Sequence, residues 1–309
     1  LLFDEPAREE ASRHAGESQF RWLALSDDPE AVALRAGLQR CFELADSGRS
    51  ALRGALMHER WGQHVGALAH LLTLGMLAAQ DWRVHNEPDF GAKSPDILAT
   101  RGADAGRGAE SGADGGPGAA GGAAGGERLL VEVRAITGAG SFPWERRRES
   151  GRTLAHDPAK EQVVLDTVAK VLARKAESYR QLVQQLRIPF LICIYEDKDS
   201  ELSRLVRELG FGRGAGADQR GERADARDPE GGAFADRAGL GHLSGVIVLR
   251  RLDTPDGRLL LAGDLIENPG AEVPLPPAAL PLLRPYRLDA TFAPPRMRFA
   301  APETRPVAL

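Results

Sequence analysis

The chain has 309 residues, which is enough for one large domain or two small ones. Its formal net charge of -4 and its pI near 6.0 exclude a general polyanion binder, so any contact with nucleic acid must come from a local patch. The two cysteines, Cys41 and Cys193, fit no CxxC spacing, and no apolar run is long enough to span a membrane. With no signal peptide and no disulfide framework, we expect a cytoplasmic protein without a membrane partner.

The first part of the chain is predicted to be helical. Residues 29–45 have helical spacing, and residues 1–48 are taken as an N-terminal helical segment. Ser50 is a suitable cap for a long helix that runs to about Gln80. Its apolar residues recur at helical spacing, at Trp61, Val65, Leu68, Leu72 and Met76.

Short strands follow this helical part. Residues 81–90 begin as a strand that Pro88 breaks, and residues 94–100 (SPDILAT) and 129–136 (LLVEVRAI) are apolar runs typical of buried strands. Residues 102–126, which join these two runs, are almost entirely Gly and Ala with scattered charges, so they cannot bury a core. We expect this segment to be a disordered, overgrown hairpin connection.

The second part alternates helices and strands. Asp157 before Pro158 predicts the start of a helix that runs to about Leu186. Further elements are expected in the order strand, helix, strand and strand, at residues 189–195, 200–209, 243–249 and 258–262, with a second flexible insertion at 212–240. The Pro-rich tail, residues 266–309, is expected to hold little regular structure. Residues 49–265 are therefore predicted to form an α/β domain with a mixed central sheet flanked by helices.

Each of the two apolar runs contains one carboxylate, Asp96 in the first and Glu132 in the second. A carboxylate inside a buried strand is costly unless it is paired or bound to a cation. Two of them on neighbouring strands therefore suggest a divalent-metal site. The alternative is that each carboxylate lies on the solvated face of a half-buried strand.

Lys175 is the unusual residue of the helix that begins at Pro158. It lies on the apolar stripe, four residues from both Val171 and Tyr179, in a chain that otherwise prefers Arg. A lysine in such a place is expensive unless it meets carboxylates, and Asp96 and Glu132 are suitable partners. The alternative is that it lies at the edge of the stripe and extends to water.

These features resemble the PD-(D/E)XK nuclease superfamily, through Pro95-Asp96 on one strand and Glu132 on the next. The resemblance covers about residues 50–195 and implies a restriction-endonuclease-like αβββαβ core. It implies that Asp96 and Glu132 bind Mg²⁺ (or Mn²⁺), which activates a water and neutralises charge on the scissile phosphate. The family's catalytic lysine stands two residues after the second acid, where this chain has Arg134. Some members supply that lysine from the following helix, a place that Lys175 occupies here.

Other family features have weaker counterparts. Glu59 matches an additional acid that some members carry on the first helix, and it is also explained as a solvated surface glutamate. Arg146, Arg147 and Arg148 follow the Glu132 strand and are candidates for phosphate contacts, although a run of charges also suits a solvated loop.

The resemblance implies a Mg²⁺-dependent endonuclease that acts on DNA, with Asp96, Glu132, Lys175 and Arg134 at its site. A second hypothesis is a degenerate nuclease fold that binds nucleic acid or a protein partner without cleavage, which Arg134 and the acidic pI favour. A third is an unrelated α/β domain with a coincidental motif. A homodimer is compatible with each of them.

Overall fold

A computed structural model describes residues 1–13, 19–58, 60–91, 93–102, 126–136, 158–196, 202–211, 232–235, 237–252, 259–289, 296–299 and 306–308. The predicted disorder of residues 103–125 and 212–231 lies outside these ranges. Within them, no helix is both long enough and apolar enough to cross a membrane.

The first part of the chain is helical, as the sequence predicts. Asp28 caps one helix by accepting a hydrogen bond from the Glu30 amide at 2.8 Å, and Pro29 occupies its first turn. The single helix expected from Ser50 to Gln80 is wrong, because one helix ends at Leu56 and the next begins only at Trp61. The first of these helices begins after Gly48, which has a φ of 65°. The helices are α1 (Glu5–Arg13), α2 (Gln19–Leu25), α3 (Pro29–Leu44), α4 (Arg49–Leu56) and α5 (Trp61–Ala78).

Strands and helices then alternate, in the predicted order. The expected helix after Asp157 is α7, and the expected central strand is β4. The elements are β1 (Arg83–Asn86), β2 (Ile97–Arg101), β3 (Glu127–Ala135), α7 (Pro158–Leu186), β4 (Phe190–Glu196), α8 (Leu202–Phe211), η2 (Ala233–Ala235), α9 (Arg237–Leu240), β5 (Gly245–Leu252), β6 (Leu260–Glu267), β7 (Arg284–Asp289), β8 (Arg296–Phe299) and β9 (Val307–Ala308).

The strands form one mixed sheet in the order β1-β2-β3-β4-β5-β6-β7-β8, with β9 paired to β6. β1, β2 and β3 are antiparallel neighbours, whereas β3, β4 and β5 run parallel. The parallel pair β3 and β4 is joined through a segment that contains α7. The predicted α/β class with a mixed sheet flanked by helices is therefore confirmed.

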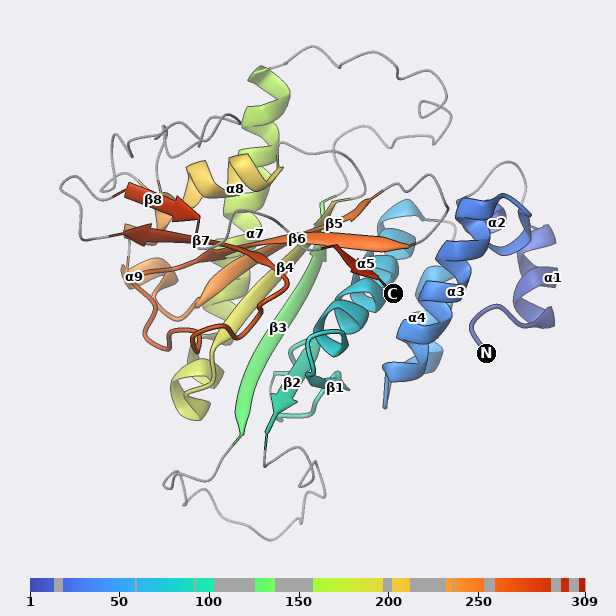
Figure 1. The fold of residues 1–309 in the computed structure, drawn as a ribbon, viewed down its shortest axis with the longest axis horizontal. Helices are drawn as coiled ribbons and strands as arrows, with labels where there is room; N and C mark the ends of the chain where they lie inside the picture. The colour runs from blue at the N-terminus through green and yellow to red at the C-terminus, as the bar shows by residue number, and fades with distance from the viewer. Residues whose placement is uncertain are drawn as a thin grey trace, which may run out of the picture.

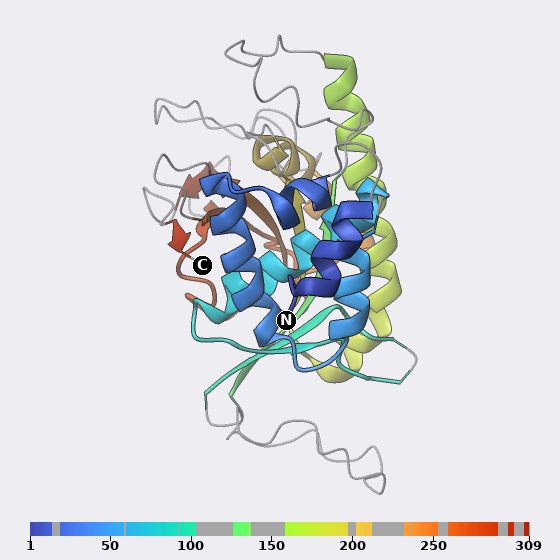
Figure 2. The same cartoon turned by 90° about the vertical axis from the view of Figure 1, so that its right-hand side faces the viewer.

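Helices cover both faces of this sheet. α1 to α5 gather on one side, and α7 and α8 lie on the other (Figures 1 and 2). The strands alternate between the two layers, since Val131 and Cys193 pack with α5 while Leu130 and Ile192 pack with α7. Residues of the same parity as Leu130, such as Glu132, therefore face α7.

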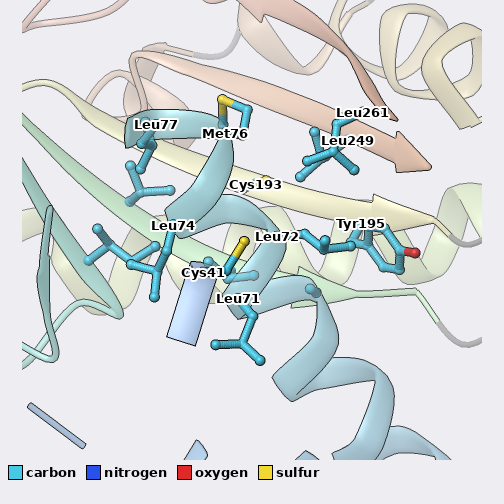
Figure 3. Packing of buried hydrophobic residues seen from close by; sticks show 14 of the residues in the cluster. Cys41, Leu71, Leu72, Leu74, Met76, Leu77, Cys193, Tyr195, Leu249 and Leu261 are labelled. Atoms are coloured by element: carbon cyan, nitrogen blue, oxygen red, sulfur yellow. The ribbon is translucent and has the colours of Figure 1, made fainter. Parts of the chain in front are cut away.

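The core beside α5 contains both cysteines. Cys41 of α3 and Cys193 of β4 lie among the leucines of α5 and the side chains of the central strands (Figure 3). Both thiols are free and buried, and burial raises the pKa of each to about 12. Neither cysteine is therefore a reactive thiol near neutral pH.

Two predictions for the second part of the chain are wrong. Residues 232–235 and 237–240 are not part of a flexible insertion, because Phe234 packs edge-on against Phe211 and Leu240 is buried. The tail does form regular structure, because β7 and β9 pair with β6, and β8 extends the sheet beyond β7. Apolar contacts and open sheet edges decide both outcomes, and neither is visible in local composition.

Gly245 tests the packing of the central strands. A Cβ added there would lie 2.8 Å from the Ile266 carbonyl oxygen on β6, which is backbone and cannot rotate away. We expect Gly245→Ala to lower the free energy of unfolding by about 1–3 kcal/mol, measured by urea denaturation.

The matched control is Gly66 in the interior of α5, where an added Cβ meets no atom within 4 Å. Gly66→Ala should raise the free energy of unfolding by about 0.5–1 kcal/mol, because alanine restricts the unfolded chain and favours helix. If Gly245→Ala and Gly66→Ala changed the free energy of unfolding equally, the close packing described for Gly245 would be contradicted.

Candidate functional site

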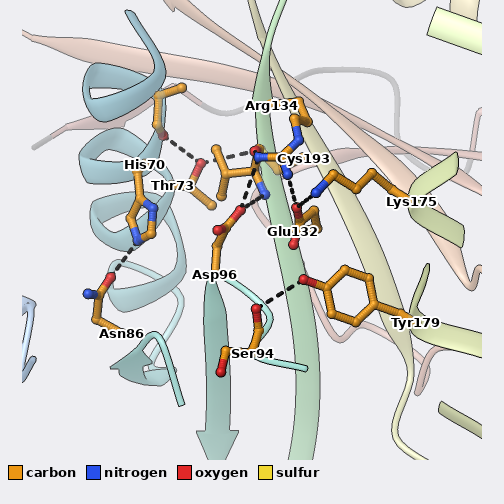
Figure 4. Close-up of polar contacts among 12 residues, drawn as sticks. His70, Thr73, Asn86, Ser94, Asp96, Glu132, Arg134, Lys175, Tyr179 and Cys193 are labelled. Carbon is orange, nitrogen blue, oxygen red and sulfur yellow. Dashed lines mark hydrogen bonds and ion pairs between the residues drawn. The ribbon is translucent and has the colours of Figure 1, made fainter. Parts of the chain in front are cut away.

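The register of β2 and β3 aligns the two predicted carboxylates. Ile97 is paired with Val131 and Leu98 with Leu130, so one further step places Asp96 opposite Glu132. Directly opposed residues of an antiparallel pair have their side chains on the same face of the sheet. Figure 4 shows the two carboxyl groups beside β3, with Arg134 near both of them and Lys175 at Glu132.

Glu132 is the most deeply buried charge of the site, with 1% of its side chain exposed. Its Oε1 atom lies 2.6 Å from Nζ of Lys175, which reaches down from α7. The same Oε1 forms an ion pair with Nη2 of Arg134. Of the two orientations expected for Lys175, the structure therefore has the one toward the carboxylates, with a direct contact to Glu132.

Arg134 bends back over the strand that carries it. Besides Glu132, its guanidinium donates a hydrogen bond to the Val133 carbonyl oxygen at 2.7 Å. Its Nη1 atom lies 3.7 Å from Oδ2 of Asp96. A guanidinium presents several donors in one plane, which lets this one side chain approach three oxygen atoms at once.

Asp96 is held by the neighbouring strand. Its Oδ2 atom accepts a hydrogen bond of 2.6 Å from the amide of Val133. Burial and the negative charge of Glu132 raise the pKa of Asp96 to about 6, although the Val133 amide, Arg134 and Lys175 oppose the shift. The two cations therefore do not remove the whole cost of placing two carboxylates side by side.

Tyr179 is a site residue that sequence reasoning had placed only in the hydrophobic stripe of α7. Its hydroxyl donates a hydrogen bond of 3.0 Å to the carbonyl of Ser94, two residues before Asp96. Burial, followed by the negative charges of Glu132 and Asp96, raises the pKa of this phenol, so it stays protonated and continues to donate. Tyr179 thereby fixes the loop that carries Asp96.

His70 of α5 was also missed. Its Nε2 atom lies 2.5 Å from Oδ1 of Asn86, and both side chains are buried. Burial lowers the pKa of His70, and the hydrogen bond with Asn86, followed by the charge of Glu132, partly opposes this shift. A histidine in the apolar run of α5 was the available signal in the sequence. The pair is drawn at the left of Figure 4.

The carboxylates retain capacity for a further ligand. Oε2 of Glu132 is buried and accepts no hydrogen bond of ordinary geometry within the described residues, although the Tyr179 hydroxyl lies close enough to Glu132 for this contact to help raise the pKa of the phenol. Buried polar atoms normally have a partner, so this oxygen suits a cation or a water molecule. The described ranges contain no group of three or more His, Cys, Asp or Glu side chains that could hold a metal. Mg²⁺ is often held by one or two carboxylates plus waters, so Asp96 and Glu132 fit that ion.

The structure brings together four of the predicted site residues: Asp96, Glu132, Arg134 and Lys175. The remaining candidates, Glu59 and Arg146, Arg147 and Arg148, lie outside the described residues.

Comparison with known proteins gives no relative. The chain has no significant match to a protein-family model, a curated protein or a solved structure.

The raised pKa of Asp96 predicts a pH-dependent effect on stability. The folded state binds the Asp96 proton more tightly than the unfolded state does. The ionised carboxylate therefore destabilises the fold, and this effect is complete above about pH 6. It vanishes below pH 3.8, the ordinary pKa of an aspartate. Asp96→Asn should therefore raise the free energy of unfolding near pH 8 by about 1–3 kcal/mol. The gain should shrink as the pH falls from 6 toward 4.

Asparagine keeps an oxygen that can accept from the Val133 amide, so the comparison isolates the charge. Urea unfolding of both proteins at several pH values provides the measurement. An Asn variant that is less stable than wild type at pH 8 would show that Arg134 and Lys175 fully compensate Asp96.

Proposed function

We propose that this chain is a Mg²⁺-dependent (or Mn²⁺-dependent) endonuclease that hydrolyses phosphodiester bonds in DNA. The observation that carries the proposal is the convergence of Asp96, Glu132 and Lys175 from two strands and a helix. A buried pair of carboxylates beside a lysine ammonium is the set of groups that metal-assisted phosphodiester hydrolysis needs.

The order of elements supports a restriction-endonuclease-like core. α5, then β1 to β3, then α7 and β4 follow one another in the sequence αβββαβ. The antiparallel β1 to β3 and the parallel step to β4 give the sheet its mixed character. The acids lie where β2 begins and near the end of β3, beside α7.

Asp96 and Glu132 are the residues that would hold the divalent cation, through Oε2 of Glu132 and the Asp96 carboxylate. A bound divalent cation lowers the pKa of the attacking water and neutralises charge on the phosphate. Lys175 fixes Oε1 of Glu132 at 2.6 Å and keeps further N–H donors for a water or a phosphate oxygen. Tyr179 keeps the Asp96 loop in place through Ser94.

A second candidate is a degenerate nuclease fold that binds nucleic acid or a protein partner without cleavage. The contacts of Arg134 with Glu132 and Asp96 favour it, because they place a positive charge on both carboxylates that would hold a metal. An arginine also cannot deprotonate to accept a proton from water.

Lys175 separates the two candidates. In the nuclease, Lys175→Ala should abolish Mg²⁺-dependent nicking of plasmid DNA, a loss of about 10²-fold or more, while leaving the far-ultraviolet circular dichroism spectrum unchanged. Lys175→Arg should restore little, since a guanidinium cannot copy the compact ammonium. Arg134→Ala should reduce nicking less than Lys175→Ala does.

Lys170 provides the matched control, because it lies on the same helix with an exposed side chain. Lys170→Ala should nick at the wild-type rate, and Asp96→Ala together with EDTA defines the background. Nicking that survives Lys175→Ala would reject the role given to Lys175. If the wild type nicks no DNA, the degenerate candidate is favoured.

A further inference from the structure

We propose that the Arg134 guanidinium is a resident counter-ion of the Asp96–Glu132 pair, which a divalent cation must displace before it can bind. The inference builds on the proposed function, because it concerns loading of the same site. It assigns Arg134 a role that is separate from catalysis.

The contacts of Arg134 are those of a bound cation. The guanidinium lies near three oxygen atoms that belong to three residues. They are Oε1 of Glu132, the Val133 carbonyl oxygen at 2.7 Å and Oδ2 of Asp96 at 3.7 Å. Carboxylate and carbonyl oxygens are also the ligands that Mg²⁺ and Mn²⁺ prefer. The guanidinium and a divalent cation held by Glu132 and Asp96 therefore draw on the same two carboxylates.

The charges of the four side chains explain why a divalent cation and Arg134 would compete for this site. Two carboxylates face two cations, Arg134 and Lys175, so the charges of the four groups cancel. A divalent cation added to this arrangement would give it a net charge of about +2 in a site of low dielectric constant, where like charges repel strongly. With Arg134 withdrawn, the excess falls by one charge, while Lys175 still contacts Oε1 of Glu132 and the Val133 amide still donates to Oδ2 of Asp96.

Arg134 can withdraw more easily than the other members of the group. Its side chain is 33% exposed, whereas those of Asp96, Lys175 and Glu132 are 25%, 24% and 1% exposed. It projects from the penultimate residue of β3, at the rim of the sheet. Rotation of the guanidinium into water keeps its charge solvated and leaves the strand pairing intact.

The test measures Mn²⁺ affinity by the free-ion signal in electron paramagnetic resonance. Arg134→Gln removes the charge and should tighten Mn²⁺ binding by about tenfold to a hundredfold, the scale set by a hydrogen bond to a charged group. Arg134→Met, which fills similar space without a donor, should give the same change. The double variant Asp96→Asn with Arg134→Gln should lose the gain.

Arg174 supplies the control, because it lies beside Lys175 in the chain but is exposed on the outer side of α7. Arg174→Gln removes the same charge and should leave Mn²⁺ affinity unchanged. Unchanged or weaker Mn²⁺ binding in both Arg134 variants would overturn the proposal. It is equally overturned if both variants are unfolded and Mn²⁺ does not restore their structure, because a counter-ion that the fold requires cannot be displaced.

This outcome is independent of cleavage. Tighter Mn²⁺ binding by the Arg134 variants without plasmid nicking supports the resident counter-ion and rejects the nuclease. Nicking by the wild type together with unchanged Mn²⁺ affinity in the variants supports the nuclease and rejects the counter-ion.

Discussion

The buried carboxylate of Glu132 on β3 requires positively charged side chains around it. Glu132 is almost fully enclosed, and an unpaired charge in such a place costs several kcal/mol (roughly 3–5 when a partner is removed). The neighbours that neutralise it come from different elements, Lys175 from α7 and Arg134 from β3 itself. The position of α7 on this face of the sheet is therefore an electrostatic requirement as well as a packing one.

The same helix also secures the second carboxylate. One helical turn after Lys175, Tyr179 holds the Ser94 carbonyl and with it the entry to β2. The Val133 amide holds Asp96 from the side of β3. Each carboxylate is thus fixed by a group from outside its own strand, so that the geometry of the pair depends on the docking of α7 and on the β2–β3 register together.

Part of the free-energy cost of burying these two carboxylates is not offset by their neighbours. Asp96 keeps a raised pKa even beside two cations, and one oxygen of Glu132 accepts no hydrogen bond of ordinary geometry in the described ranges. A fold selected only for stability would place apolar side chains here, because replacing buried ionic groups with packed apolar residues is often neutral or stabilising. Carboxylates with a perturbed pKa and an unpartnered oxygen are typical of functional sites.

The sequence by itself determined the α/β class, the order of elements from α5 to α8, and the four candidate site residues that the structure brings together. Periodicity and apolar runs located α7 and the strands from β1 to β6, because these signals arise from neighbours along the chain. The stripe containing Lys175 left two orientations of that lysine open, and the structure selects the one toward Glu132. Only the tertiary structure decided that Arg134 folds back onto Glu132, that Tyr179 reaches Ser94, and that the tail adds strands to the sheet. Those outcomes depend on contacts between residues far apart in sequence or on the choice of side-chain rotamer, which local patterns do not encode.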